Sequence, residues 1–258
     1  MKRFPIIFIL ILALFFLFYK NPCAKPYITF NFDDAYSDQF TNAFPIFQKH
    51  NIAGVVFVPT ELVGSEFENH SLMNWQQLAQ LKNAGWDIES HGVSHSSFTD
   101  MKISEVINEL TESKRMLKEH GFDTKIIAIP YGNYSDDTKK IVSEYYTAAR
   151  ASEWGHNSLK CMDGGCARGS PLAFDRYDLK SVWMFNDTSI ETMKSWIDET
   201  AKNNYWTIIQ VHLVREDLSW KYTISPDNLD ELVAYIKSKN VEVKTISDVL
   251  DMHCDDHE

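Results

Sequence analysis

The sequence lacks the features that usually divide a chain into domains. No proline-, glycine- or serine-rich stretch, low-complexity run or internal repeat follows residue 25. We therefore expect one domain over residues 25–258, a length that suits α/β barrels of roughly 200–250 residues. Basic residues are also few, with 25 lysines and arginines against 36 aspartates and glutamates and a net charge of −11. Nucleic-acid-binding domains usually carry a basic stripe, so we expect no nucleic-acid partner.

Cysteine is scarce as well, with four in the chain: Cys23, Cys161, Cys166 and Cys254. In an exported protein such cysteines favour disulfides. Cys161 and Cys166 flank an Asp-Gly-Gly turn and can pair with each other. A small metal knuckle is the competing interpretation of this pair. A second bridge, between Cys23 and Cys254, is a speculative addition.

The first 24 residues differ in kind from the rest. Lys2 and Arg3 precede an uncharged run, Phe4–Tyr19, which Lys20 closes. A basic start followed by an apolar stretch is typical of a secretory signal or an uncleaved anchor. The run is short for a permanent helix, since about 20 apolar residues span a bilayer. We expect an extracytoplasmic protein, and both release and membrane tethering stay open.

Short apolar runs alternate with helical patterns along the remaining chain. The expected strands are Tyr27–Phe32, Ala53–Val58, Trp86–Glu89, Lys125–Ile129, Thr147–Ala151, Ser181–Met184, Trp206–Val211 and Val241–Thr245. The expected helices are Asp38–His50, Trp75–Ala84, Ile103–His120 and Asn228–Lys239, with Ser135, Ser189 and Ser225 as helix caps. This alternation predicts an α/β fold with a parallel sheet covered by helices, either open or closed into a barrel.

Polar clusters follow three of these strands. Asp33 and Asp34 come after the first strand, His91 and His95 after the third, and His212 after the seventh. The carboxyl ends of parallel strands gather on one face, where α/β folds place their sites. Two imidazoles and one carboxylate can hold Zn²⁺ and leave a position open for water. If residues 91–95 form a helical turn, both imidazoles lie on one side of it.

The second aspartate of the pair leaves a general base within reach of such a water. His212 is a candidate general acid. Each signal has an ordinary alternative, since aspartates often begin loops and histidines near turns are often plain surface residues. The combination at three strand ends is what favours a hydrolytic metal site.

Four motifs resemble those of the polysaccharide deacetylases, carbohydrate esterase family 4 with its NodB-homology domain. They are Thr29–Tyr36 with its Asp33-Asp34 pair, His91–Ser96, Pro130–Tyr134 and Ile209–His212. Their order and spacing agree with the family from about Tyr27 onward. The histidine pair and the Pro-Tyr-Gly turn are the most specific of these elements.

The resemblance implies a distorted (β/α) barrel of about seven strands that hydrolyses an acetamide on a sugar. It implies that Asp34, His91 and His95 bind a divalent metal, for which we expect Zn²⁺, and that Asp33 is the base. It further implies that His212 protonates the leaving amine and that the Tyr131 backbone N–H helps to hold the oxyanion. The implied partner is a polysaccharide, and we expect a monomer.

Several positions depart from the family pattern. Ala35 replaces a glycine of the first motif, and Gly92 replaces a serine or threonine of the second. Ile127–Ile129 stands where the family often carries an arginine that orients the base, which predicts weaker stabilisation of Asp33. The fourth motif, an aspartate-tryptophan pair, is not clear; nearby candidates without an assigned role are Asp175, Asp178 and Trp183.

Other residues are left with general expectations. Aromatic residues in or near the expected rim loops could stack on sugar rings or serve as core: Tyr36, Tyr134, Trp154, Trp183 and Trp220. We expect His70, His156 and His253 to be solvated, and Asp251–Glu258 to be a frayed acidic tail.

The leading hypothesis is a metal-dependent deacetylase of an extracytoplasmic polysaccharide that contains N-acetylated amino sugars. One alternative is an O-acetyl esterase or non-sugar amide hydrolase on the same barrel, which the absent arginine motivates. The other is a non-catalytic carbohydrate-binding barrel that retains metal for stability.

Overall fold

The structure is a computed structural model, and it describes residues 25–159 and 173–254. The leader or anchor expected over residues 1–24 lies outside the described residues. So do Cys23, Cys161 and Cys166 and the side chains of Cys254 and His253, and with them the expected disulfides. In the described part, no helix has the length and apolar character needed to cross a membrane.

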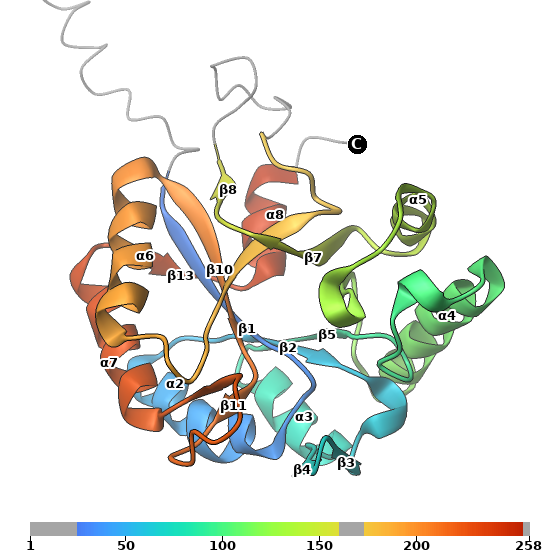
Figure 1. Ribbon diagram of the computed structural model, residues 1–258, viewed down its shortest axis with the longest axis horizontal. Helices are drawn as coiled ribbons and strands as arrows, with labels where there is room; N and C mark the ends of the chain where they lie inside the picture. The colour runs from blue at the N-terminus through green and yellow to red at the C-terminus, as the bar shows by residue number, and fades with distance from the viewer. Residues whose placement is uncertain (1–24, 160–172, 255–258) are drawn as a thin grey trace, which may run out of the picture.

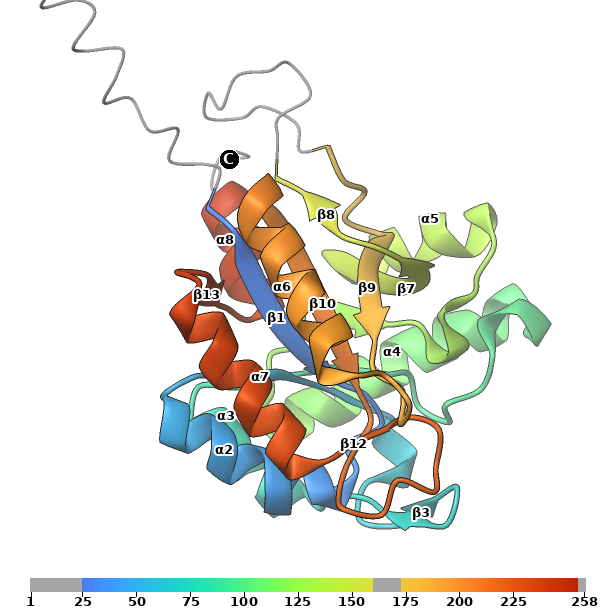
Figure 2. The same ribbon diagram turned by 60° about the vertical axis from the view of Figure 1, so that its left-hand side comes forward.

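Seven parallel strands close into a barrel in the order β1-β2-β5-β6-β7-β9-β10, and β10 pairs back with β1 (Figures 1 and 2). The prediction of a barrel of about seven strands is thus confirmed. The barrel strands are β1 (Tyr27–Phe32), β2 (Val55–Val58), β5 (Asp87–Ser90), β6 (Ile126–Ala128), β7 (Ala148–Trp154), β9 (Leu179–Trp183) and β10 (Tyr205–Val211).

Six two-residue strands accompany the barrel. They are β3 (Glu66–Phe67), β4 (His70–Ser71), β8 (Asn157–Ser158), β11 (Leu213–Val214), β12 (Thr223–Ile224) and β13 (Glu242–Val243). Of these the sequence predicts only β13. The antiparallel β3–β4 hairpin and the parallel β11–β12 pair are separate from the barrel sheet.

Helices lie around the outside of the strands (Figure 1). The helices are α2 (Phe44–His50), α3 (Trp75–Asn83), α4 (Ile103–Glu119), α5 (Asp136–Tyr145), α6 (Ile190–Asn203), α7 (Pro226–Ser238) and α8 (Ile246–Cys254). Short turns of other helix types are η1 (Gln39–Ala43), η2 (Thr60–Leu62), η3 (Phe98–Asp100) and η4 (Pro130–Gly132). The helix expected over Asp38–His50 is therefore two segments, of which η1 has the wider π-helical turn.

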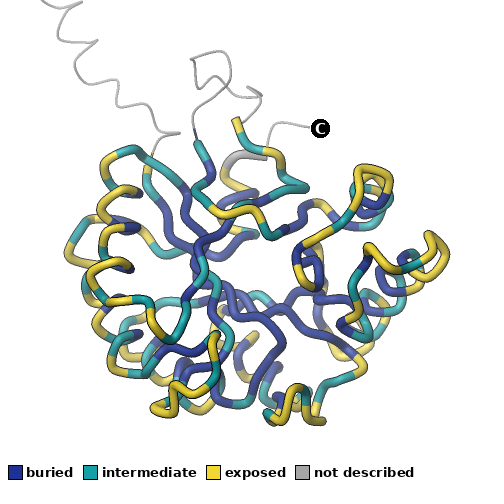
Figure 3. The backbone as a smooth tube through the Cα atoms, viewed as in Figure 1, coloured by how far each residue is buried: buried dark blue, intermediate teal, exposed yellow. Residues whose placement is uncertain are grey.

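The side-chain alternation of the strands builds two layers of core. Phe30 and Phe32 of β1 face outward and pack with Phe47 of α2 at ring distances of 5.1 and 5.4 Å. Tyr27 of β1 and Trp206 of β10 belong instead to the cluster inside the barrel. β1 is accordingly buried from end to end, whereas β7 ends in the exposed residues Glu153 and Trp154, and many exposed positions lie on the helices (Figure 3).

Helix ends follow the sequence signals. The side chains of Ser135, Ser189 and Ser225 each accept a hydrogen bond from the backbone N–H three residues later, which confirms the three predicted caps. The prediction of a frayed acidic tail over Asp251–Glu258 is wrong in part. Residues 251–254 belong to α8, which contributes Ile246, Val249 and Leu250 to the cluster inside the barrel.

Candidate functional site

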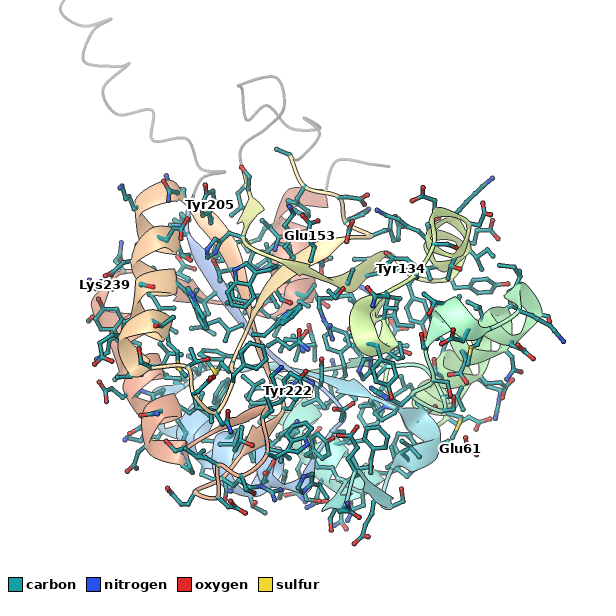
Figure 4. All side chains as sticks on the ribbon, viewed as in Figure 1. Glu61, Tyr134, Glu153, Tyr205, Tyr222 and Lys239 are labelled. Atoms are coloured by element: carbon teal, nitrogen blue, oxygen red, sulfur yellow. The ribbon has the colours of Figure 1, made fainter. Side chains whose placement is uncertain are left out.

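A pocket of about 230 Å³ opens at the carboxyl ends of the barrel strands. It is lined by Asp33, Asp34, Phe67, Glu68, His91, His95, Ile129, Tyr131, Gly132, Arg150, Ser152, Trp183, Gln210, His212, Trp220 and Tyr222. Figure 4 shows one of these residues, Tyr222, well inside the outline of the molecule, whereas Glu61 and Lys239 lie at its edge. All six site residues expected from the sequence therefore meet in one pocket.

The two aspartates leave β1 in a backbone conformation that separates their side chains. Asp34 and Ala35 both have positive φ, 66° and 58°, which is uncommon outside glycine and costs free energy. The turn is held on both sides. The Asp33 N–H donates to the Val211 carbonyl (3.0 Å), and the Ala35 carbonyl accepts from the Met73 N–H (2.7 Å). Ala35 thus adopts a left-handed conformation at the position where the resemblance implies glycine.

The two histidines come together through a loop, so the helical turn considered for residues 91–95 does not form. Gly92 and His95 have φ of 76° and 58°, outside the helical region. Glu109 of α4 holds the loop, since its carboxylate accepts from the backbone N–H groups of Val93 (2.6 Å) and Ser94 (3.1 Å). The glycine fits here because a Cβ would lie 2.9 Å from Glu109 Oε2.

The Asp34, His91 and His95 side chains offer three ligand atoms that lie within 4.8 Å of one another. Asp34 Oδ1 lies 3.0 Å from His95 Nε2 and 3.6 Å from His91 Nε2. Among the described residues, this oxygen has no partner that meets hydrogen-bond geometry. The three atoms thus face a common point, which fits a metal ion better than it fits pairwise contacts.

The protonation states of this trio also fit a metal site. Burial lowers the pKa of His91 to about 4, so its imidazole is neutral at neutral pH. Its Nδ1 lies 2.8 Å from the Ala128 carbonyl, which leaves the Nε2 lone pair free for a ligand. Burial opposes ionisation of Asp34, but His95 and the other imidazoles outweigh it and hold its pKa well below the usual range.

Three side chains hold the Asp33 carboxylate, and one of them corrects the sequence analysis. Arg150 of β7 donates to Oδ2 at 2.6 Å, and both side chains are almost fully buried. Gln210 also donates to Oδ2 (2.7 Å), and Asn31 donates to Oδ1 (2.5 Å). The arginine that is absent before Pro130 is therefore supplied from the next strand, and the expected loss of stabilisation is wrong.

A short relay fixes the orientation of Gln210. The Trp183 indole N–H donates to Ser181 Oγ (3.1 Å), and this hydroxyl donates to Gln210 Oε1 (3.2 Å). With its oxygen occupied, Gln210 directs its NH₂ group at Asp33.

Trp183 lines the pocket and takes part in this relay, so one of the three candidates for the fourth motif lies at the site. The other two, Asp175 and Asp178, pair with Lys139 instead.

His212 lies at the end of β10 and faces both aspartates. Its Nε2 is 3.8 Å from Asp33 Oδ2 and 3.9 Å from Asp34 Oδ2. Its Nδ1 is buried and has no hydrogen-bond partner among the described residues. The rings of Trp220 and Tyr222 flank the imidazole at 5.8 and 5.1 Å. Aromatic packing therefore surrounds the imidazole on the side of these two rings.

Tyr131 forms the rim of the pocket beside His95. Its φ is 58°, its ring lies 4.9 Å from that of His95, and 58% of the residue is exposed. Gly132 follows with φ 73° against β7, where a Cβ would overlap the Ser152 backbone. Close packing between this turn and β7 therefore fixes the Tyr131 backbone at the pocket edge.

The aromatic residues expected in or near the rim loops lie partly at the pocket and partly away from it. Trp183 and Trp220 line the pocket, and Tyr36 is buried beside it. Tyr134 donates to the Tyr177 carbonyl away from the pocket, and Trp154 is half exposed.

The prediction of solvated histidines is wrong for two of them. Arg215 Nη1 lies 3.2 Å from His70 Nδ1, and His156 Nδ1 lies 2.6 Å from Thr207 Oγ1. Both residues are only partly exposed.

Sequence reasoning missed the residues that support the site. Gln39 donates to the carbonyls of Asp33 (2.6 Å) and His212 (2.8 Å) and so joins the ends of β1 and β10. Glu109 and Arg150 were missed as well. An arginine inside the apolar run Thr147–Ala151 was an available signal, because a buried charge requires a partner.

A family model for polysaccharide deacetylases matches residues 20–148. Among curated proteins, the chain is similar to the poly-beta-1,6-N-acetyl-D-glucosamine N-deacetylase of Staphylococcus epidermidis, with 30% identity over 136 residues (48% of this chain, 47% of that protein). The enzyme of the same name from Staphylococcus aureus strain MSSA476 is 32% identical over 142 residues (50% and 49%). The chain spans about half the length of these relatives.

Solved structures share the fold at low identity. A structure described as T48 deacetylase with substrate has a TM-score of 0.59 and 14% identity, covering 89% of this chain and 94% of that one. A family 4 acetyl xylan esterase from Clostridium thermocellum with a cobalt ion has a TM-score of 0.58 and 16% identity (88% and 91%). A family 4 pseudoenzyme from Bacillus anthracis has a TM-score of 0.58 and 14% identity (88% and 66%). Since these neighbours differ in activity, they show the fold alone.

Proposed function

The chain belongs to the polysaccharide deacetylase family, and from that membership we propose that it is a metal-dependent hydrolase that removes acetyl groups from N-acetylated amino sugars of an extracytoplasmic polysaccharide. The observation that carries the proposal is the convergence of Asp34, His91 and His95 on one point, with a buried Asp33 beside them. Residues 1–24 support export. The substrate named for the staphylococcal relatives makes β-1,6-linked N-acetylglucosamine the first polymer to test.

The proposed ligands are Asp34, His91 and His95, which form the two-imidazole, one-carboxylate set of catalytic zinc sites. A divalent metal bound there supplies Lewis acidity for the acetyl carbonyl and acidifies a water. Zn²⁺ is the proposed metal because the neutral His91 imidazole suits it. His91 is oriented for this role by its contact with the Ala128 carbonyl.

The proposed base is Asp33, which takes a proton from the attacking water. Arg150, Gln210 and Asn31 fix its carboxylate without closing it off from the pocket that it lines. The proposed acid is His212, which gives a proton to the nitrogen as the C–N bond breaks. Water and the acetamide thus become acetate and a free amine. The Tyr131 N–H is proposed to stabilise charge on the acetyl oxygen, a role typically worth ~10²–10³ in rate.

The test is acetate release from defined N-acetylglucosamine oligomers by the purified chain loaded with zinc, with an acetyl ester and a small non-sugar amide as competing substrates. We expect the oligomer to be the best substrate, chelation to abolish turnover and added zinc to restore it. A preference for the ester would favour the O-acetyl esterase. Tight oligomer binding without turnover by the metal-loaded protein would favour the non-catalytic barrel. Because Arg150 is in place, the argument that motivated the esterase is gone.

A further inference from the structure

The β3–β4 hairpin forms one wall of the pocket through a strained two-residue turn. Phe67 pairs with His70, and the turn residues Glu68 and Asn69 have φ of 51° and 62°. Two successive positive φ values are typical of a tight hairpin turn that favours asparagine and glycine. Asn69 suits this conformation, but glutamate does not, so turn propensity does not account for Glu68.

The hairpin is anchored to the catalytic residues on both strands. The Phe67 ring lies 4.8 Å from the His95 ring, and the His70 ring lies 5.7 Å from that of Trp220. A backbone hydrogen bond from Leu72 to Ser65 (2.9 Å) extends the hairpin, and one from Met73 to Ala35 (2.7 Å) attaches it to the turn that follows Asp34. The position of Glu68 relative to the metal ligands is therefore fixed.

The Glu68 carboxylate is a pocket charge that acts through space to raise the pKa of the nearby His70 and His95, against the lowering effect of burial, but it pairs directly with no described residue. Glu68 lines the pocket and is exposed, and it makes no ion pair or side-chain hydrogen bond with any residue in the described ranges. Asp33 and Asp34, the other acidic residues of the lining, are already engaged by Arg150 and by the histidines. The charge of Glu68 is felt inside the pocket, since it adds to burial in raising the pKa of Tyr131.

We propose that Glu68 binds the ammonium group of a glucosamine unit next to the N-acetylglucosamine unit being hydrolysed. This inference rests on the proposed function, because the reaction itself converts each neutral acetamide into an amine that is protonated at mildly acidic pH. As a chain is processed, its neighbouring sugars become cations. The same pocket lining includes three aromatic residues, Trp183, Trp220 and Tyr222, which suit an uncharged sugar face. The pocket thereby favours partly deacetylated chains.

The experiment compares two trisaccharides of equal length at mildly acidic pH, one fully acetylated and one with a glucosamine unit beside the reacting sugar. Glu68→Gln is expected to raise KM about two- to fivefold for the glucosamine-containing substrate, the size of an exposed ion pair, and to leave kcat unchanged. The fully acetylated substrate should show no change. Added salt should reduce the difference between wild type and variant.

Two further variants control for the hairpin. Glu66→Gln removes a carboxylate from the same hairpin but outside the pocket lining, and it should act like wild type. Glu68→Asn suits the turn and also removes the carboxylate from reach. It should reproduce the substrate discrimination of Glu68→Gln with an unfolding temperature at or above that of wild type.

An equal loss on both trisaccharides, or none on either, would overturn the ammonium assignment while acetate release by wild type still supported the proposed function. A wild-type protein that releases acetate from neither substrate would overturn the proposed function and this inference with it.

Discussion

Asp33 owes its environment to residues far away in the sequence. Arg150 lies 117 positions from it and Gln210 lies 177 positions away, and both reach it across the barrel. The motif around Asp33 and Asp34 could be read locally, because both residues follow one strand directly. The contacts of Arg150 depend on which strands are neighbours and on their register, and strand periodicity alone does not determine these.

Arg150→Met tests whether this arginine positions Asp33. Removing one partner of a buried ion pair leaves an uncompensated charge, so we expect the free energy of unfolding to fall by about 3–5 kcal/mol. We also expect kcat to fall by roughly 100-fold because the base is no longer held. Arg150→Lys should recover part of both losses. Urea unfolding and acetate release measure these effects.

The matched control is Arg215→Met, which removes the Arg215–Asp38 pair (2.7 Å) without touching Asp33. It should cost less stability and little activity. Equal effects of the two arginine variants on kcat would contradict a positioning role for Arg150.

Glu89 is a second buried carboxyl, at the contact between β5 and β6. Its Oε2 accepts from the Thr124 hydroxyl (2.6 Å) and from the N–H groups of Lys125 (2.9 Å) and Ile126 (2.8 Å). Burial nevertheless raises its pKa from 4.5 to about 7. Between these values the native state keeps a proton that the unfolded chain has lost, so this group makes stability fall as pH rises.

Glu89→Gln removes that titration. Wild type should lose stability relative to the variant by at most about 1.4 kcal/mol per pH unit between about pH 4.5 and 7, with no further change above that range. Urea unfolding of both proteins across this range measures the difference. A difference that is constant with pH, or that moves in wild type's favour as pH rises, would show that Glu89 is ionised in the native protein.

Among the elements, barrel strands and capped helices were the predictable ones. The expected strand Tyr27–Phe32 agrees residue for residue with β1, and Ser225 caps α7 as its sequence indicates. Long apolar runs and caps are local signals. The β3–β4 hairpin was not predicted, because two-residue strands have no measurable period. The conformation of the loop that joins His91 to His95 could not be predicted, because a spacing of four does not reveal positive φ values.

That loop provides a test at the scale of an element. Gly92→Ala would place a Cβ 2.9 Å from Glu109 Oε2, whose hydrogen bonds hold the loop. We expect zinc affinity to fall by roughly tenfold or more, as it does when residues that orient metal ligands are disturbed. Gly121→Ala is the control, since Gly121 has a similar φ of 87° with no atom within 4 Å of the added Cβ.

Both glycine variants should lose about 1–2 kcal/mol of stability from backbone strain. Only Gly92→Ala should bind zinc more weakly, as measured by competition with a chelating dye. Unchanged zinc affinity in Gly92→Ala, or equal loss in both variants, would contradict the role given to the loop.

For the whole molecule, strand–helix alternation predicted a parallel sheet but could not decide between an open sheet and a barrel. The family resemblance predicted a barrel, and the pairing of β10 with β1 confirms that the sheet is closed. Closure also explains why segments far apart in the sequence meet at one pocket, since it brings the ends of β1 and β10 side by side. The centre of the site was predictable from its motifs. Its supporting residues were not, because they are joined only by the closed barrel.

The most direct test of the account is to measure metal content and acetate release in wild type and Asp33→Asn side by side. We predict about one equivalent of metal in both proteins, since Asp33 is proposed as the base and not as a ligand. Acetate release should fall by ~10²–10⁴ in the variant, the usual contribution of a general base. Loss of metal along with activity would make Asp33 a ligand, and retained activity would remove it from the reaction; either result would contradict the account.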